Sequence, residues 1–488
     1  MDPQKYETVI GLEVHAQLRT KTKLFCGCST EFGKTPNTLT CPVCLGLPGA
    51  LPVLNAAAAE MAVKLALAVH ARINPRSQFS RKNYFYPDLP KGYQITQYHH
   101  PIAEEGWLRI DGSGRPKIIG IERINLEEDA GKSIHDGLPD SSEKTSLDFN
   151  RSGVPLLEIV GRPDLSSASE AAEFLQLLRA TLQYLEICDG NMEEGSLRCD
   201  ANLSLKEKGS STMGVKTEIK NLNSFRFLQK ALDYEAERQA AEIAAGRPIR
   251  QETRLWDPVR NRTWPMRSKE EAHDYRYFPE PDLPLLVLDE NFMERAKASL
   301  PELPQEKVER LIETYRIPAY DANLMAQSRG LADYFERTAA LLENPKAASN
   351  WIMREVLQYL HGQRIDIGQF PIPAERLADL IRRVDDGTLT LTAAKDIVFP
   401  KMIAGGKEAS AIVVEEGLGQ IADEEALKKT AREIVAANPG PLKQYREGKR
   451  QVFGFFVGLM MKETKGRANA PLAHKILKEI LDGDKGSS

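Results

Sequence analysis

Apolar and polar residues alternate in several stretches of the first half of the chain. Residues 8–18, 197–205 and 215–220 each place apolar side chains on one face and polar side chains on the other. A period of two is the pattern of a half-buried strand. Residues 118–124 form a further predicted strand, and the apolar run 155–160 is typical of a buried one. The first half is therefore expected to be rich in sheet.

Helical periodicity occupies the segments between these strands and most of the second half. Residues 54–69, 167–185 and 223–246 repeat apolar side chains at helical spacing, and Asn223 and Gly246 are typical start and stop residues. Beyond about residue 291 the composition shifts to helix formers interrupted by Pro and Gly. The helices expected there are 302–315, 322–342, 347–361, 374–384 and 393–402.

These patterns divide the chain into an α+β body and a helical remainder. Gly405-Gly406 is typical of a hinge, and helical sequence resumes after it. We therefore expect three domains, residues 1–290, 291–405 and 406–488, which suits a chain of 488 residues.

Composition limits the possible classes of function. Hydrophobic residues make up 42% of the chain and charged residues 27%, as in ordinary globular proteins. The net charge of −4 requires any nucleic-acid surface to be local. No apolar run reaches membrane-spanning length, the N-terminus lacks a signal sequence, and six cysteines are too few for a disulfide scaffold. These features predict a cytoplasmic protein that does not enter the membrane.

Acidic side chains and one histidine recur on the polar faces of the predicted strands. Glu158 lies inside an apolar run, where a carboxylate must be paired, metal-bound or protonated. For each residue taken alone, the simpler alternative is a side chain that turns to water. A repeated carboxylate with one histidine is instead typical of ligands for Mg²⁺ or Mn²⁺, which hold phosphates during phosphoryl transfer. The set is Glu13, His15, Glu127, Glu128, Glu158, Asp200 and Glu218.

Two members of this set are adjacent in the sequence. Strict alternation places Glu127 and Glu128 on opposite faces of one strand. Both can serve one site only if the strand ends or bulges there. The nearby Gly131-Lys132-Ser133 is not a Walker-type phosphate loop, because the first glycine of that motif would fall at Leu126.

Four of the cysteines form two closely spaced pairs. Cys26 and Cys28 are separated by one residue, and Cys41 and Cys44 by two, with twelve residues between the pairs. This spacing suits a tetrahedral Zn²⁺ site, closed and structural because the protein fills every position. Four independent reduced thiols are the alternative. Cys188 and Cys199 lack such a pattern and are expected in the core.

Two further segments have unusual compositions. Residues 81–94 interleave cations with aromatics, which suits a loop that meets a polyanion or a partner, although an ordinary surface loop is equally compatible. Residues 274–284 contain three prolines and are expected to be extended.

The end of the chain is locally basic. Residues 443–478 hold nine Lys or Arg and two acids, an excess that can bind a phosphate backbone without reading sequence. The turn at residues 465–469 is the part expected to touch phosphates. A cationic helical surface without a ligand is the alternative.

Six motifs resemble one known family closely. They are GLEVH (11–15), RKNYFYP (81–87), EEDAGK (127–132), LDFNRSGVPLLEIV (147–160), MEEGSLRCD (192–200) and DYRYFPEP (274–281). Together they resemble the B subunits of bacterial glutamyl/aspartyl-tRNA amidotransferases, and the resemblance covers essentially the whole chain. It implies a cradle-like α+β body built on an antiparallel sheet, an all-helical domain and a small helical tRNA-binding tail.

The resemblance also implies an enzyme that works in a heterotrimer with a glutaminase, the A subunit, and a small C subunit. The glutaminase releases ammonia from glutamine. The B subunit uses ATP and Mg²⁺ to phosphorylate the side-chain carboxylate of Glu or Asp misacylated on tRNA, and ammonia then displaces the phosphate. Whether the Gln route, the Asn route or both operate is left open by the sequence.

The same resemblance suggests roles for individual residues. It implies that His15, Glu127 and Glu158 hold the catalytic Mg²⁺, and that Glu13, Glu128, Asp200 and Glu218 hold a second cation. Lys82, Lys91 and Arg198 are candidates for cofactor binding, and the two lysines also for the ammonia path or the substrate carboxylate. The four paired cysteines match the zinc-bearing branch of the family.

Two other classes of function remain as alternatives. One is a non-catalytic tRNA-binding scaffold, which would have no use for seven converging ligands. The other is a self-sufficient ATP-dependent ligase that adds free ammonia to a small amino acid, which would act without tRNA.

Overall fold

The computed structural model describes residues 5–111, 114–135, 137, 141, 143–266, 274–419, 424–464 and 467–483. The chain divides into two compact units, Met1–Lys307 and Val308–Ser488, and each is described by itself. The mixed content of the first unit and the helices of the second confirm the predicted α+β class.

The first unit is built on a nine-stranded sheet with the order β14-β13-β12-β11-β1-β10-β7-β6-β2. Neighbouring strands are antiparallel except β12 and β13, which are parallel. The predicted strands are confirmed, although the one expected at 215–220 begins at Thr217. The strands are β1 (Tyr6–Gln17), β2 (Arg72–Ile73), β6 (Ala103–Ile110), β7 (Lys117–Glu128), β10 (Pro155–Gly161), β11 (Leu197–Glu207), β12 (Thr217–Lys220), β13 (Glu252–Asp257) and β14 (Arg262–Pro265).

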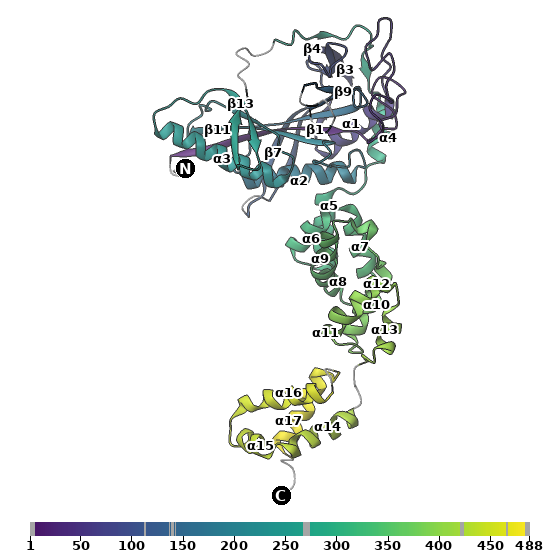
Figure 1. The fold of residues 1–488 in the computed structure, drawn as a ribbon, viewed down its shortest axis with the longest axis vertical. Coiled ribbons are helices and arrows are strands. Elements are labelled where there is room, and N and C mark those ends of the chain that lie inside the picture. The colour runs from purple at the N-terminus through teal and green to yellow at the C-terminus, as the bar shows by residue number, and fades with distance from the viewer. Residues whose placement is uncertain are drawn as a thin grey trace. The chain divides into compact units, whose positions relative to one another are not determined.

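The long helices α2 (Ala168–Tyr184) and α3 (Phe225–Ala244) run along one face of this sheet (Figure 1). Each begins at a serine, Ser167 or Ser224, whose side chain accepts an N–H of the first turn. The expected start at Asn223 was therefore one residue early. The helix α1 (Ala56–Ala68) contacts α4 (Glu290–Ala298), and the apolar faces of these helices and the sheet form the first core.

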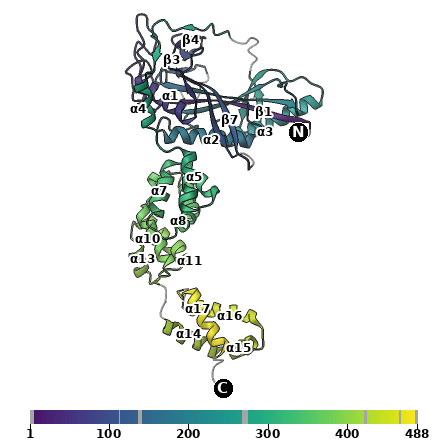
Figure 2. The same cartoon turned by 180° about the vertical axis from the view of Figure 1, so that it is seen from behind.

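A smaller sheet lies over the other face of the large one, as the view from behind also shows (Figure 2). It has the order β15-β4-β5, and its strand β5 contacts β7 of the large sheet. Two short pairs, β16-β3 and β8-β9, flank it. These strands are β3 (Arg76–Ser77), β4 (Phe79–Asn83), β5 (Tyr93–Gln97), β8 (Lys132–Ile134), β9 (Ser146–Asp148), β15 (Phe278–Pro279) and β16 (Leu286–Val287).

The second unit is helical throughout its described part. Its first core is formed by α5 (Pro304–Tyr315), α6 (Ala319–Ala326), α7 (Arg329–Ala339), α8 (Pro345–Trp351), α9 (Leu357–Gln363), α10 (Ala374–Asp385), α11 (Leu391–Ala393), α12 (Phe399–Gly405) and α13 (Ala409–Glu415). The π-helical turns Ile352–Val356 and Ala394–Val398 join α8 to α9 and α11 to α12. No helix in the described part of either unit is long and apolar enough to cross a membrane.

The single helix expected at 322–342 is wrong. Two helices occupy this segment, because Ser328 adopts an extended backbone and its side chain caps α7 by accepting the N–H of Leu331. A serine that can cap a helix is a start signal, but the continuous apolar periodicity concealed it here.

The end of the chain forms a separate small core from α14 (Glu424–Ala437), α15 (Pro439–Arg446), α16 (Phe453–Glu463) and α17 (Ala470–Asp482). Gly406, at the predicted hinge, ends α12 in a left-handed conformation with φ of 59°. The next helix, α13, still packs in the preceding core through Ala409 and Ile412. The domain bounds 1–290, 291–405 and 406–488 stay predictions.

Candidate active site

Three carboxylates surround one histidine on the face of the large sheet that β5 covers. The Nε2 atom of His15 lies 3.6 Å from Glu13 Oε1, 3.9 Å from Glu127 Oε1 and 3.9 Å from Glu158 Oε1. Ligand atoms of Glu13, His15 and Glu158 all lie within 4.8 Å of one another. Neighbouring ligands of an octahedral Mg²⁺ lie about 3 Å apart and opposite ones about 4 Å apart, so this donor set fits such an ion.

The strand register explains why these residues meet. Glu13 and His15 are two residues apart on β1 and therefore share a face. His15 stands opposite Glu158 of β10, and Glu158 stands opposite Asn125 of β7. Glu127 lies two residues beyond Asn125 and shares its face. Alternation within each strand and the register between strands therefore place these polar side chains on one face of three adjacent strands.

Burial and mutual repulsion set the protonation of this cluster. Burial, reinforced by the Glu158 charge, raises the pKa of Glu127 to about 8 and that of Glu13 to about 7. Burial lowers the pKa of His15, which keeps the imidazole neutral and available as a ligand. A divalent cation would relieve the repulsion and favour the ionised carboxylates.

Two neutral side chains orient the carboxylates. Thr96 of β5 donates its hydroxyl hydrogen to Glu127 Oε2 over 2.8 Å, and Asn125 Nδ2 donates to Glu158 Oε2 over 2.6 Å. Both residues are buried. Neither was predicted from the sequence, although Asn125 was detectable as an amide between Ile124 and Leu126, directly after the strand predicted at 118–124.

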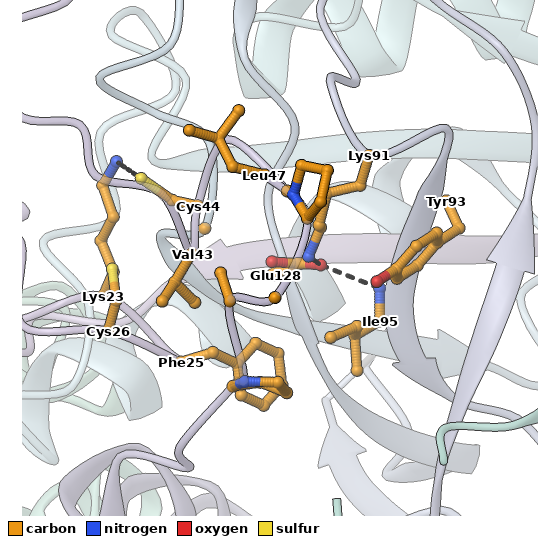
Figure 3. A pocket seen from close by; sticks show the side chains of 16 residues that line it. Lys23, Phe25, Cys26, Val43, Cys44, Leu47, Lys91, Tyr93, Ile95 and Glu128 are labelled. Atoms are coloured by element: carbon orange, nitrogen blue, oxygen red, sulfur yellow. Dashed lines mark hydrogen bonds and ion pairs between the residues drawn. The ribbon is translucent and has the colours of Figure 1, made fainter. Parts of the chain in front are cut away.

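Glu128 lies apart from the other predicted ligands of a second cation. It forms a buried ion pair with Lys91 and accepts the N–H of Ile95 over 3.0 Å. Both residues line a pocket of about 210 Å³ that also contains Cys26 and Cys44 (Figure 3). The strand neither ends nor bulges between Glu127 and Glu128, so alternation separates them.

Asp200 and Glu218 already share a cation from the protein. The Nζ atom of Lys220 lies 2.7 Å from Asp200 Oδ2 and 3.0 Å from Glu218 Oε1. Asp200 stands opposite Glu13 in the register, so this group continues the polar face away from His15. Lys220 was not among the predicted site residues, although it alternates with Glu218 in the sequence.

The other predicted cations lie on different elements around the cluster. Arg198 stands opposite His15 on β11 and pairs with Asp129, with Nη1 3.1 Å from Oδ2. Lys82 of β4 lies over the Tyr275 ring at 4.9 Å from its centroid. Burial opposes its charge, but Glu127, Tyr277 and Glu158 outweigh this effect and raise the pKa of Lys82.

The four paired cysteines converge as predicted. The Sγ atoms of Cys26, Cys28, Cys41 and Cys44 all lie within 4.8 Å of one another. The Sγ atoms of Cys41 and Cys44 are 3.9 Å apart, close to the roughly 3.8 Å expected between thiolates of a tetrahedral zinc site. A hydrogen bond from Cys26 lowers the pKa of Cys44 to about 4, and the Lys23 ammonium contributes to this shift. This donor set fits Zn²⁺.

Sequence comparison identifies the family. A family described as "GatB/GatE catalytic domain" matches residues 8–294, and one described as "GatB domain" matches residues 333–481. The chain belongs to the GatB family.

Relatives of this chain carry names that agree with the family. A protein from Thermodesulfovibrio yellowstonii, named as the B subunit of an aspartyl/glutamyl-tRNA(Asn/Gln) amidotransferase, is 52% identical over 477 residues, which cover 98% of this chain and 99% of the relative. A relative of the same name from Moorella thermoacetica is 52% identical over 477 residues, 98% of this chain and all of its own length (100%).

The cluster described above lies within the catalytic-domain match. His15, the three carboxylates around it and all four paired cysteines fall within the part that matches the GatB/GatE catalytic domain. The predicted resemblance to amidotransferase B subunits is therefore confirmed.

Proposed function

We propose that this chain activates and amidates the side-chain carboxylate of Glu or Asp misacylated on tRNA. Its relatives are named as B subunits of aspartyl/glutamyl-tRNA(Asn/Gln) amidotransferases. The observation that carries the proposal is the cluster of Glu13, Glu127 and Glu158 around His15 within a catalytic domain of the GatB family. A scaffold without chemistry is not favoured, because it would not need a buried group of mutually repelling carboxylates.

His15, Glu127 and Glu158, joined by Glu13, would hold Mg²⁺, or Mn²⁺ in its place. Bound there, the ion would neutralise the phosphate charge of ATP and polarise the group in transfer. Asp200 and Glu218 are less suited to a second ion, because Lys220 already neutralises them. Glu128 would not bind this second ion, because it lines the separate pocket and is paired there with Lys91.

The reaction needs ATP because a carboxylate has no good leaving group. A substrate carboxylate oxygen would attack the γ-phosphorus of ATP and ADP would leave. Ammonia would then attack the carbonyl carbon, and phosphate would leave with that oxygen. Thr96 and Asn125 would hold Glu127 and Glu158 in place. Lys82, charged and close to both carboxylates, would offset the phosphate charge, and Arg198 would border the same face.

The chain would act within an assembly. The relatives are named as B subunits, so we propose that a glutaminase, the A subunit, supplies ammonia and that a small C subunit belongs to the same complex. The cysteine cluster would hold a structural Zn²⁺, since its four thiols leave no position open for substrate.

Conversion of Glu-tRNA to Gln-tRNA by the reconstituted complex tests this proposal. Ammonium chloride replaces glutamine, so the assay does not depend on the glutaminase. We expect Glu158→Gln to reduce conversion at least about a hundredfold while tRNA affinity stays unchanged. The matched control is Glu122→Gln, an exposed glutamate of the strand that carries Glu127. Equal conversion by Glu158→Gln and wild type would refute the assignment and favour the scaffold.

A further inference from the structure

A row of tyrosines beside the carboxylate cluster is not used by the proposed reaction. Tyr84 and Tyr98 follow strands β4 and β5, while Tyr275 and Tyr277 precede β15, nearly two hundred residues later in the chain. The row comes from the two segments whose composition is unusual, residues 81–94 and 274–284, together with the residue that follows β5.

Specific contacts fix the later segment against β4. The backbone N–H of Asn83 donates to the Tyr275 carbonyl over 3.0 Å, and its side-chain Nδ2 donates to the Arg276 carbonyl over 2.8 Å. Arg81 holds the end of the segment through two hydrogen bonds to Glu280, at 2.7 and 2.9 Å. The tyrosines of both segments are therefore held in place before any ligand binds.

The rings contact one another in a continuous row, in which one pair is stacked and two pairs meet edge to face. Tyr98 and Tyr277 lie nearly parallel, with centroids 4.0 Å apart and an angle of 6° between planes. Tyr275 meets Tyr277 edge to face at 5.9 Å, and Tyr84 meets Tyr275 in the same way at 6.0 Å. Tyr98 is 46% exposed, so the row ends at a ring that is accessible to solvent.

Cations flank the row, and the carboxylate cluster adjoins it. Lys82 lies over Tyr275 and approaches Glu127 closely enough for that charge to raise its pKa. Arg276 is exposed, lies between the two tyrosines of its segment in sequence and makes no side-chain ion pair with any residue that the structure describes. Tyr98 lies two residues after Thr96, the partner of Glu127.

We propose that the tyrosine row, Tyr84, Tyr98, Tyr275 and Tyr277, is a nucleobase-stacking subsite. Proteins hold unpaired nucleotides by stacking bases on aromatic rings and by placing cations near the phosphates, and both components are present here. The ligand is an unpaired adenine-containing nucleotide, which ATP and the 3′ end of a tRNA both provide. This inference rests on the proposed function, because either nucleotide must reach the cluster around His15.

A binding experiment on the reconstituted complex tests the subsite with two ligands. One arm measures the affinity for ATP, and the other compares uncharged tRNA with the same tRNA lacking its unpaired 3′ nucleotides. Tyr98→Ala and Tyr277→Ala remove stacking rings, and Tyr98→Phe and Tyr277→Phe restore them without the hydroxyl. The matched control is Tyr320→Ala, because Tyr320 is a 73% exposed tyrosine on α6.

We expect the alanine variants to lower affinity about tenfold in one arm and the phenylalanine variants to recover most of it. A loss confined to ATP assigns the row to the ATP base. A loss confined to intact tRNA assigns it to the 3′ end. Affinities within about twofold of wild type in both arms, or an equal loss in Tyr320→Ala, would overturn the inference. A wild-type complex that converts no tRNA would instead contradict the proposed function.

Discussion

At Glu127, burial and the neighbouring Glu158 charge raise the pKa from 4.5 to about 8. A carboxyl whose pKa is raised in the folded state takes up a proton on folding between these two values. Its ionisation therefore lowers the free energy of unfolding as the pH rises from 4.5 towards 8. A metal ion that binds the ionised form must displace this proton, so metal binding and pH are coupled here.

We predict that Mg²⁺ binds the metal-free protein at least about tenfold more weakly at pH 6 than at pH 8.5. Protons on Glu127 and Glu13, whose pKa is raised to about 7, compete with the ion over this range. Titration calorimetry in two buffers of different ionisation enthalpy measures both affinity and proton release. Glu122→Gln should keep the pH dependence, and equal affinity at both pH values would contradict this coupling.

Asp129 shows the opposite shift. Burial raises its pKa, but Arg198 and Arg151 outweigh burial and lower it below 3.8. The ionised Asp129 therefore stabilises the folded protein fully at pH values above 3.8, the pKa of the unfolded chain. This stabilisation is lost as the pH falls through the lower pKa of the folded protein. Gln17 also donates to Asp129 over 2.7 Å.

Replacing Asp129 with Asn should lower the free energy of unfolding by about 2 kcal/mol, because Arg198 and Arg151 then lose their carboxylate partner. Urea unfolding at neutral pH measures the loss. Asp282→Asn is the control, since Asp282 is 37% exposed and its pair with Arg81 should contribute less than about 1 kcal/mol. Equal losses of unfolding free energy in Asp129→Asn and Asp282→Asn would contradict the larger contribution expected from the buried Asp129.

Residue types and spacing selected the residues that meet around His15 but not the neighbours that orient them. Glu13, His15 and Glu158 could be selected because carboxylates and a histidine interrupt predicted strands. Thr96 and Lys220 could not, because their roles follow from which strands become neighbours, and that order depends on packing far along the chain. Glu128 is separated from the set to which it was assigned by the alternation of side chains along β7, since no bulge lies between it and Glu127.

At the scale of elements, the loop between residues 26 and 44 is held by its cysteines and by hydrogen bonds to a later segment. The described residues 29–40 contain no strand or helix except a single bridge between Thr22 and Ser29. Asn37 and Asn150 attach the loop to the segment before β10 by hydrogen bonds. The thiol cluster, with Lys23 buried beside Cys44 at 3.6 Å, joins the two ends of this loop.

We predict that the purified chain holds one zinc ion and that Cys28→Ala loses it. The variant should melt about 5 °C lower and be cut faster by protease within residues 29–40. Metal analysis and limited proteolysis measure these effects. Cys188→Ala, which removes a buried thiol outside the cluster, should keep the zinc. Zinc retained by Cys28→Ala would refute the assignment of the four cysteines as the zinc site.

Periodicity also predicted most helices of the second unit. It failed at Ser328, where a cap interrupts a continuous apolar stripe. It also predicted a helix through Pro400, and the structure accommodates this proline at the start of α12, after a π-helical turn.

At the scale of the whole molecule, the basic residues near the end of the chain are candidates for binding a phosphate backbone. Lys475 and Lys478 of α17 are exposed on the surface of the helical group formed by α14 to α17. Arg450 is partly neutralised by Asp482 at 3.1 Å. Lys465 and Gly466 of the turn expected to touch phosphates lie outside the described residues.

We predict that ending the chain at Gly419 weakens tRNA binding and flattens its dependence on salt, because phosphate contacts release counterions. This cut keeps α13, which belongs to the preceding core, whereas a cut at residue 406 would remove it. Equilibrium binding at several salt concentrations measures the slope. Replacing both Lys475 and Lys478 with Gln should reduce the slope by up to about two. An unchanged affinity and slope in the truncated protein would refute this role.

The proposed chemistry turns the substrate carboxylate into an acyl phosphate at the cluster around His15, and isotope transfer follows that step directly. The reconstituted complex receives Glu-tRNA labelled with ¹⁸O in its side-chain carboxylate, together with ATP, Mg²⁺ and ammonium. We expect one ¹⁸O atom in each phosphate released by the wild type and none above background with Glu158→Gln. Phosphate without the label, at a normal yield of Gln-tRNA, would contradict the acyl phosphate.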